Sequence, residues 1–242
     1  MQLVVSWTNT DPDYVPPTGD PYWSYVSLLL HCNGSNGSTT ITDNSTNAFS
    51  PTVGSPAQIS TSQSIFGGAS LSFDGASAYI RYADHLNLRL GFNDFTIEIG
   101  FRPSSVTGYR CIAEYRDAFT AHGWTLFQDN STLYFYAGDA NTTAWEIGLS
   151  AASALSANNW YRAAITRIGS TWRLFLDGVE KASGTWSGAI EMSGFGTPYL
   201  TFGKFFNDSG YFSGYMDEIR ISNGVGRYSA GYTLAAAEFL NS

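Results

Sequence analysis

Short runs in which apolar and polar residues alternate recur along most of this chain. The clearest lies at residues 95–102, where every second side chain from Phe95 to Phe101 is apolar. Alternation of period two places the apolar side chains on one face of a strand, and no stretch sustains the period of a helix. Strands are also expected at 26–31, 71–73, 110–115, 124–128, 132–136, 160–167, 172–176, 181–186, 200–206 and 212–224.

Tight turns separate these runs. Asp129-Asn130 joins two neighbouring runs, and Ile168-Gly169-Ser170 predicts a hairpin between two others. Because two stacked antiparallel sheets bury many alternating runs, the pattern predicts an all-β fold, a two-sheet antiparallel jelly-roll sandwich. No unit of about 20–50 residues repeats along the chain, which argues against a propeller or a solenoid.

The run at 212–224 contains a break in its alternation. Met216 and Ile219 are both apolar but have opposite parity, so a regular strand would not point both at one core. This predicts a β-bulge near Asp217-Glu218. An acid held at a bulge is expected to bind backbone amides, an arginine or a cation.

Residues 1–25 differ from the rest of the chain. Four prolines between positions 11 and 21 oppose sheet pairing and favour an extended arm. Five aromatic side chains in the same segment are costly to leave in water. We therefore expect an N-terminal arm over 1–25 that docks on its own domain or on a neighbouring chain, followed by one jelly-roll domain over 26–242.

Composition narrows the classes of partner. The 242 residues are 43% hydrophobic and 16% aromatic, enough for one large β domain. The net charge of −8 and the lack of a basic stripe argue against nucleic-acid binding and against anionic membranes. No run is long enough to span a bilayer, and the first residues lack the features of a signal peptide, so synthesis in a cytosol is expected. Cys32 and Cys111 are expected to be buried free thiols, with a disulfide as the alternative.

Five motifs in order resemble the laminin-G-like, concanavalin A-like lectin/glucanase jelly rolls. They stand at 71–75, 95–103, 159–164, 174–178 and 214–221, and the resemblance covers about 24–239. It implies the same jelly-roll fold and a lectin-like function.

Two further stretches, 27–40 and 223–233, resemble the opening and closing of such domains in structural proteins of tailed bacteriophages. This resemblance implies a virion protein, a tail-fibre or capsid-decoration component that is assembled in the host cytoplasm and displayed on the virion surface. It would bind host or environmental glycans and contact other phage structural proteins, or sister subunits of a homo-oligomer, through the arm. The alternative is a purely structural protein that stabilises the particle by protein–protein contacts.

Catalysis is not expected. Glucanases of this superfamily use two carboxylates that face one cleft from one strand. Glu98 stands alone in its run, Glu114 and Asp117 have the wrong spacing to share a strand face, and the adjacent pair Asp217-Glu218 would point to opposite faces. Glu98 is instead expected on a solvated outer face, paired with Arg102 or with a cross-strand base. A glycan depolymerase is therefore the less favoured alternative.

Calcium is the cofactor that the resemblance implies. Asp217 aligns with the acid that the family places at the bulge, and Asp43 lies in an early loop that runs nearby in the family. The alternative from the residues themselves is that Asp217 binds backbone amides and Asp43 makes an Asx turn. Zinc is not expected, because the two cysteines and three histidines lack ligand spacing.

Glycan binding would use aromatic side chains that stack on sugars beside polar neighbours. Such side chains lie in or next to loops with Asn, Asp and Ser neighbours at Trp145, Tyr134, Tyr136, Trp186 and Tyr211. The alternative for each is packing in the core or at its rim.

Overall fold

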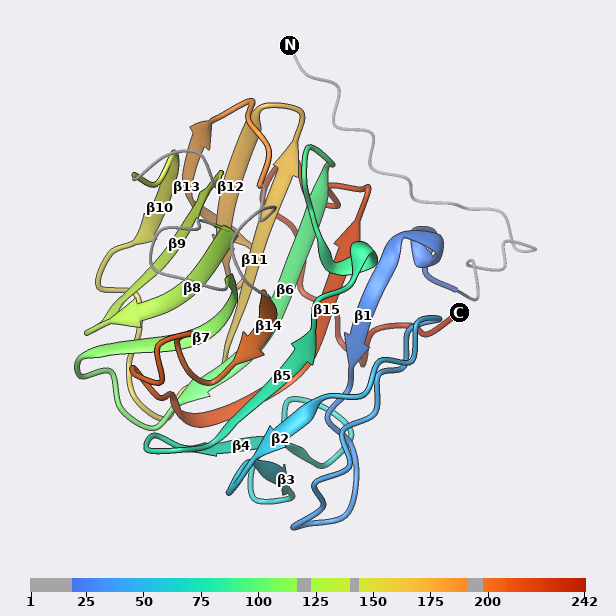
Figure 1. The fold of residues 1–242 in the computed structure, drawn as a ribbon, viewed down its shortest axis with the longest axis vertical. Coiled ribbons are helices and arrows are strands. Elements are labelled where there is room, and N and C mark those ends of the chain that lie inside the picture. The colour runs from blue at the N-terminus through green and yellow to red at the C-terminus, as the bar shows by residue number, and fades with distance from the viewer. Residues whose placement is uncertain (1–18, 117–122, 140–143, 191–197) are drawn as a thin grey trace.

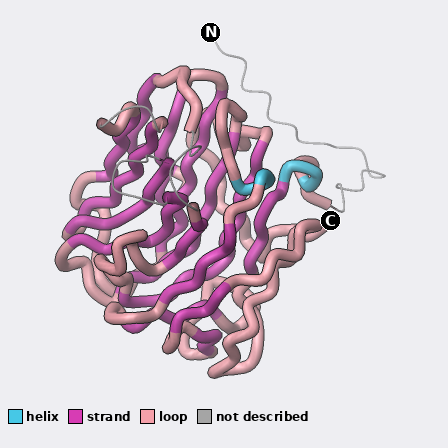
Figure 2. Tube along the Cα trace, viewed as in Figure 1, coloured by secondary structure: helices cyan, strands magenta, loops and turns pink. Residues whose placement is uncertain are grey.

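A computed structural model describes residues 19–116, 123–139, 144–190 and 198–242. The chain forms two antiparallel sheets stacked face to face (Figure 1), as the alternation predicted. Only two short 3-10 helices interrupt the strands and loops in these ranges (Figure 2), η1 (Trp23–Tyr25) and η2 (Leu86–Leu88). No helix in the described part of the chain is long and apolar enough to cross a membrane.

The first sheet has eight strands in the order β13-β12-β11-β6-β15-β4-β3, with β1 also paired to β15. Its strands are β1 (Val26–Leu30), β3 (Gln58–Ser60), β4 (Ser70–Asp74), β6 (Phe95–Pro103), β11 (Tyr161–Ile168), β12 (Thr171–Leu176), β13 (Val179–Thr185) and β15 (Ser213–Asn223).

The second sheet has seven strands in the order β10-β9-β8-β7-β14-β5-β2. They are β2 (Thr52–Gly54), β5 (Tyr79–Ala83), β7 (Tyr109–Arg116), β8 (Gly123–Asp129), β9 (Thr132–Gly138), β10 (Ile147–Ala151) and β14 (Tyr199–Phe202). The predicted turns at 129–130 and 168–170 both close antiparallel pairs, β8 with β9 and β11 with β12.

Four strands, β2, β3, β5 and β10, lie outside the predicted runs. Each has only three to five residues, too short for its alternation to stand out. The predicted run at 200–206 was too long, because β14 ends at Phe202. Gly203 follows with a φ of 92°, a left-handed conformation that turns the chain out of the sheet.

The core lies between the two sheets and includes large aromatic rings from both. Trp124 and Phe135 come from the second sheet, and their ring centroids lie 6.2 Å apart. Phe135 lies 6.2 Å from Trp172 of the first sheet, which also contacts Phe95 at 5.2 Å. These contacts join the layers because alternate residues of each strand point inward.

The bulge predicted in β15 is confirmed. The register of β15 against β6 shifts between Asp217 and Ile219, and Glu218 adopts a φ of 51°. The extra residue changes the parity of the strand, so Met216 and Ile219 are both fully buried.

Both cysteines are buried and unpaired, as expected. Cys111 lies in β7, whereas Cys32 follows the end of β1 in a left-handed conformation, with a φ of 56°. A disulfide is not formed.

Most of the predicted arm, residues 1–18, lies outside the described residues. The described end of the arm docks on its own domain. Asp20 is buried there, and its backbone N–H donates to the Ser242 carbonyl at 2.7 Å, which joins the two ends of the described chain.

Candidate functional site

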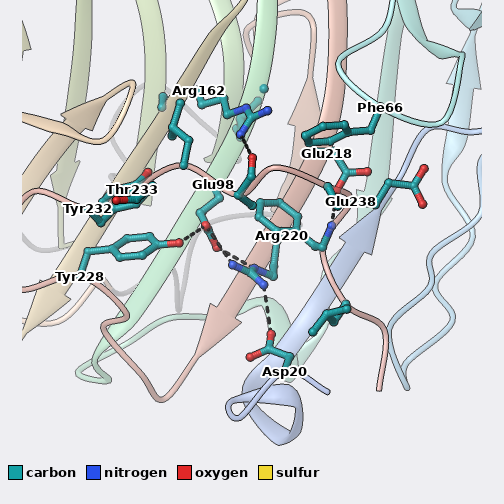
Figure 3. Close-up of a pocket in the computed structure, with 18 of the residues that line it drawn as sticks. Asp20, Phe66, Glu98, Arg162, Glu218, Arg220, Tyr228, Tyr232, Thr233 and Glu238 are labelled. Atoms are coloured by element: carbon teal, nitrogen blue, oxygen red, sulfur yellow. Dashed lines mark hydrogen bonds and ion pairs between the residues drawn. The ribbon is translucent and has the colours of Figure 1, made fainter. Parts of the chain in front are cut away.

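A pocket of about 270 Å³ opens on the outer face of the eight-stranded sheet (Figure 3). Its floor is formed by residues of β6, β11 and β15. Its rim is formed by the C-terminal segment, here residues 228–240, which crosses the sheet without adding a strand. Aromatic side chains at the rim are Phe66, Tyr232 and Phe239.

Buried ion pairs form one half of the pocket floor. Arg220 of β15 lies opposite Glu98 of β6 in register, and its Nε and Nη2 donate to the Glu98 carboxylate at 2.6 and 3.0 Å. Its Nη1 donates to Asp20 at 3.0 Å, and the Tyr228 hydroxyl donates to Glu98 at 2.7 Å (Figure 3). Burial opposes the charge on Arg220, but the attraction of Glu98 outweighs it and raises the pKa of Arg220.

The prediction for Glu98 was therefore half right. Its pairing with a base is confirmed, but Glu98 is buried rather than solvated. The base is Arg220, the cross-strand partner of Glu98, and not Arg102. The sequence signal for the pairing of Arg220 is the run Ile219-Arg220-Ile221 in a strand that is buried on both sides. A buried arginine needs a carboxylate beside it.

Glu218 forms the other half of the floor. Its Oε1 lies 2.8 Å from His31 Nδ1, and its Oε2 accepts the Phe239 backbone N–H at 2.7 Å. The hydrogen bond with Glu218 raises the pKa of His31. Every carboxylate on the floor thus already has partners in the protein, and the floor fastens the C-terminal segment to the sheet.

An aromatic cluster covers part of the outer face of the seven-stranded sheet. In β9, Tyr134 and Tyr136 alternate with residues that point into the core. Their ring centroids lie 5.9 Å apart, and the Trp145 ring lies 5.8 Å from Tyr136. Phe127 of β8 stacks on Tyr134 at 5.2 Å. We call Tyr134, Tyr136, Trp145 and Phe127 the aromatic cluster.

The cluster continues on either side. Tyr109, whose side chain is 51% exposed, lies 4.5 Å from Phe127 between ring centroids. On the other side, the Arg116 guanidinium lies 4.8 Å from the Trp145 ring and 4.7 Å from the Phe206 ring. Aromatic rings flanked by arginine are typical of binding surfaces.

One row of cross-strand partners continues from the cluster toward the far edge of this sheet. Arg81 of β5 pairs with Thr201 of β14, Thr201 with Glu114 of β7, Glu114 with Thr125 of β8, and Thr125 with Tyr136. We call these five residues the polar row. Neighbouring strands lie about 4.8 Å apart, so the row spans about 19 Å.

Three buried atoms of the polar row have no hydrogen-bond partner among the described residues: Arg81 Nε, Glu114 Oε2 and Thr125 Oγ1. The other Glu114 oxygen accepts the Phe206 backbone N–H. Burial raises the pKa of Glu114 to about 8, so this carboxyl keeps its proton at neutral pH. Native structures leave few buried polar atoms unpaired, so the row is a place where a ligand could supply partners.

The structure brings three of the five predicted glycan residues together, namely Tyr134, Tyr136 and Trp145. Trp186 instead packs against Trp172, with ring centroids 5.5 Å apart, and its carbonyl accepts the Trp172 Nε1–H at 2.9 Å. Tyr211 is half-buried in the segment between β14 and β15, and no ring contact in the described ranges joins it to the cluster. Sequence reasoning missed Arg81 and the polar row, because only the strand register aligns them.

The two predicted calcium ligands both accept backbone hydrogen bonds. Asp43 Oδ1 accepts from the N–H groups of Leu29 and Ser45, at 3.0 and 2.9 Å, and its Oδ2 accepts from Phe49 N–H at 2.8 Å. Its bond to Ser45 is an Asx turn of the expected kind.

Asp217 has the same kind of surroundings. Its Oδ2 accepts from the N–H groups of Ile65 and Phe66, at 2.6 and 3.2 Å, and its Oδ1 accepts from Glu218 N–H at 2.9 Å. Burial raises the pKa of Asp217 to about 7. The described ranges hold no group of three or more His, Cys, Asp or Glu side chains placed to bind a metal ion. Calcium stays a prediction.

Comparison with known proteins identifies the fold family. A model of the concanavalin A-like lectin/glucanases superfamily, Laminin_G_3, matches residues 74–226. The chain belongs to this superfamily. A search of the curated proteins returned no match. The superfamily assignment confirms the laminin-G-like part of the resemblance and the jelly-roll fold.

Solved structures of this superfamily fold resemble the chain at low sequence identity. The binding domain of Paraclostridial Mosquitocidal Protein 1 has a TM-score of 0.64 and 15% identity, over 85% of this chain and 50% of that one. The receptor binding domain of botulinum neurotoxin C/D mosaic serotype has a TM-score of 0.62 and 15% identity, over 84% and 49%. The chain thus spans about half the length of these toxin domains.

Domain 4 of AbnA is similar over most of its own length. AbnA is a family GH43 extracellular arabinanase from Geobacillus stearothermophilus, and this domain was solved in complex with arabinotriose. The TM-score is 0.63 and the identity 19%, over 83% of this chain and 93% of that domain. At this identity the likeness shows a common fold.

Proposed function

We propose that this chain is a non-enzymatic, lectin-like carbohydrate-binding domain, and that it binds glycans on the outer face of the seven-stranded sheet. The observation that carries the proposal is the aromatic cluster. Tyr134, Tyr136 and Trp145 come together at one end of a row of unpaired polar atoms. Aromatic faces stack on the apolar faces of sugars, and polar side chains beside them would pair with sugar hydroxyls.

The geometry of the other candidate site, the pocket on the eight-stranded sheet, favours the seven-stranded sheet as the place where glycans bind. The pocket on the eight-stranded sheet has charged groups, but Glu98 and Glu218 are already engaged by Arg220 and His31. A ligand there would compete with these buried contacts. The outer face of the other sheet instead carries the aromatic cluster, flanked by the 51% exposed Tyr109 and the partly exposed Arg116. The arabinotriose complex of the AbnA domain supports a sugar as the ligand class.

Substitution of one cluster residue tests the proposal. We expect Tyr136→Ala to weaken glycan binding roughly tenfold or more, because it removes the ring at the junction of cluster and row. Binding is measured on a glycan array and then by titration calorimetry on the glycans found. Tyr215→Ala is the matched control, since Tyr215 is likewise a half-buried strand tyrosine but belongs to the other sheet. No binding to any glycan, or equal losses in the two variants, would refute the proposal.

The absence of catalysis is part of the proposal. Its support is that Glu98 is locked by Arg220 and Tyr228 and is not available as an acid or a nucleophile. A reducing-sugar assay on the bound glycans tests it. Steady release of new reducing ends would favour the depolymerase alternative.

The finer proposal is that the domain is displayed on a tailed-phage particle, as a tail-fibre or capsid-decoration component. Its support is the resemblance of residues 27–40 and 223–233 to such proteins. The arm would fix it to the particle or to sister subunits of a homo-oligomer. A truncation that removes only 1–18 tests this anchoring, because it keeps the ion pairs of Asp20 with the domain. Unchanged incorporation into particles would contradict it, and loss of glycan binding without loss of incorporation would separate the two roles.

Calcium is proposed only as a structural ion at Asp217 or Asp43. Melting the protein with added calcium and with a chelator tests the ion directly, with magnesium as the control. A calcium-specific rise in melting temperature that is lost in Asp217→Asn would support it. Identical melting curves with calcium, with magnesium and with the chelator would show that these carboxylates serve only to accept backbone hydrogen bonds.

A further inference from the structure

Arg81 is a cation without a counterion in an acidic protein. The chain has a net charge of −8, yet no carboxylate in the described ranges forms an ion pair with Arg81. Its guanidinium lies 4.5 Å from the Tyr199 ring centroid and 5.8 Å from the Tyr79 ring centroid, and the side chain is partly exposed. Two tyrosine rings therefore hold the guanidinium at the surface of the sheet.

Among the described residues, the groups around Arg81 carry little negative charge. Its cross-strand partners are Thr52 and Thr201, both neutral. Glu114, two strands away in the polar row, holds its proton at neutral pH because it is buried. Asp208 forms an ion pair with Lys204, whose ammonium lies 4.0 Å from the Tyr79 ring centroid.

The unpaired Nε of Arg81 indicates that the guanidinium lacks acceptors. A buried donor without a partner is costly, and a native protein usually satisfies it. Carboxylate and sulfate groups match the guanidinium fork, and such charge-assisted hydrogen bonds are the strong ones. The position of Arg81 in the polar row aligns such an acid with the aromatic cluster about 19 Å away, a span that suits an oligosaccharide rather than a single sugar.

We propose that the outer face of the seven-stranded sheet selects acidic glycans, with Arg81 binding a carboxylate or sulfate of the sugar chain while the aromatic cluster stacks on its rings. This inference rests on the proposed function and names the ligand class of the same site. An acid at Arg81 restores a counterion, whereas a neutral glycan leaves the guanidinium unpaired. The face therefore distinguishes the two classes by charge as well as by contact.

The test uses matched pairs of oligosaccharides. Oligogalacturonate is compared with its carboxyl-reduced form, and a sulfated oligosaccharide with its desulfated form, by titration calorimetry on the full chain. We expect the acidic member of at least one pair to bind roughly tenfold or more tightly, and added salt to reduce that difference. The pair with the larger difference identifies the acid group.

Arg81→Gln assigns the effect to this residue. It removes the charge and is expected to abolish the acidic preference, so that the acidic and neutral members of each pair then bind with equal affinity. Arg102→Gln is the matched control, because Arg102 also lies near a tyrosine ring, Tyr215 at 6.0 Å, but on the other sheet. Arg81→Lys keeps the charge without the planar fork. Its preference for the acidic member is expected to lie between those of the wild type and Arg81→Gln. Melting curves confirm that each variant folds.

The outcomes separate the two proposals. Equal affinity for acidic and neutral members, or an acidic preference that survives in Arg81→Gln, overturns the role of Arg81 and leaves the proposed glycan site standing. Loss of the acidic preference to the same extent in Arg102→Gln and in Arg81→Gln also overturns the role of Arg81. Failure of every oligosaccharide to bind, with folded protein, overturns the proposed function itself.

Discussion

At the scale of single residues, the two sheets treat buried charge in opposite ways. Arg220 lies between Glu98 and Asp20, with hydrogen bonds to both carboxylates. Glu114 on the other sheet is fully buried, and one of its oxygens has no partner in the described ranges. A paired buried charge supports structure, whereas a buried carboxyl with a raised pKa is a common mark of a functional site.

The Arg220 network gives a prediction of stability. Arg220→Met would leave Glu98 buried without its bidentate cation and Asp20 with Arg227 alone, and we expect the free energy of unfolding to fall by about 3–5 kcal/mol in urea titrations. The double variant with Glu98→Gln should recover part of that loss. Arg102→Met, at a position with no ion pair in the described ranges, should cost about 1 kcal/mol or less. Equal losses in the two single variants would contradict the network's role.

Glu114 gives a prediction of pH dependence. Its pKa is about 8 when folded, against about 4.3 in an unfolded chain, so the folded state keeps a proton that the unfolded state has released. Its contribution to the free energy of unfolding is full below about pH 4 and is lost as pH rises through 8, with a slope of up to about 1.4 kcal/mol per unit. Glu114→Gln should remove this decline, measured as the difference from wild type in urea titrations across that range. Parallel curves for the two proteins would show that Glu114 ionises normally.

At the scale of elements, alternation predicted the long strands and parity predicted the bulge in β15. Both signals are local, because they depend only on which side of a strand meets the core. The signals failed at β2, β3, β5 and β10, whose short runs are fixed by pairing with neighbours. β5 matters most among these, since it carries Arg81.

A glycine in β15 gives the prediction at this scale. Gly214 has a φ of 144°, and a Cβ there would lie 2.1 Å from the Arg102 carbonyl oxygen. We expect Gly214→Ala to lower the free energy of unfolding by about 3–5 kcal/mol, from backbone strain and a backbone clash together. Gly169→Ala is the control, because its φ of 59° is also left-handed but the space around it is open, so strain of about 1–2 kcal/mol is its only cost. Urea titration measures both, and similar costs would contradict the clash.

At the scale of the whole molecule, the C-terminal segment closes the outer face of the eight-stranded sheet. It has no strand, but Phe239 N–H bonds Glu218, its ring lies 3.8 Å from the Arg220 guanidinium, and Ser242 accepts from Asp20. These contacts join both ends of the described chain to one buried network.

Truncation after Ala235 should therefore destabilise the domain although it removes no strand. We expect a loss of at least about 2 kcal/mol, since Glu218 loses a charge-assisted hydrogen bond and Arg220 loses its ring contact. Leu240→Ala, at a side chain that is 49% exposed, is the control and should change little. Thermal melting measures both. An unchanged melting temperature in the truncated protein would show that the segment only lies on the surface.

The sequence by itself determined the longer strands, the bulge and the fold family, because these follow from local alternation and from motifs read in order. Tertiary structure decided the partners. Arg220 and Glu98 lie far apart in sequence and meet only through the pairing of β15 with β6. The same holds for the candidate site, where register places Tyr136 and Arg81 in one row and leaves Trp186 against the core. Sequence names an aromatic residue but does not fix which face of which sheet it occupies, and that face separates a binding residue from a packing one.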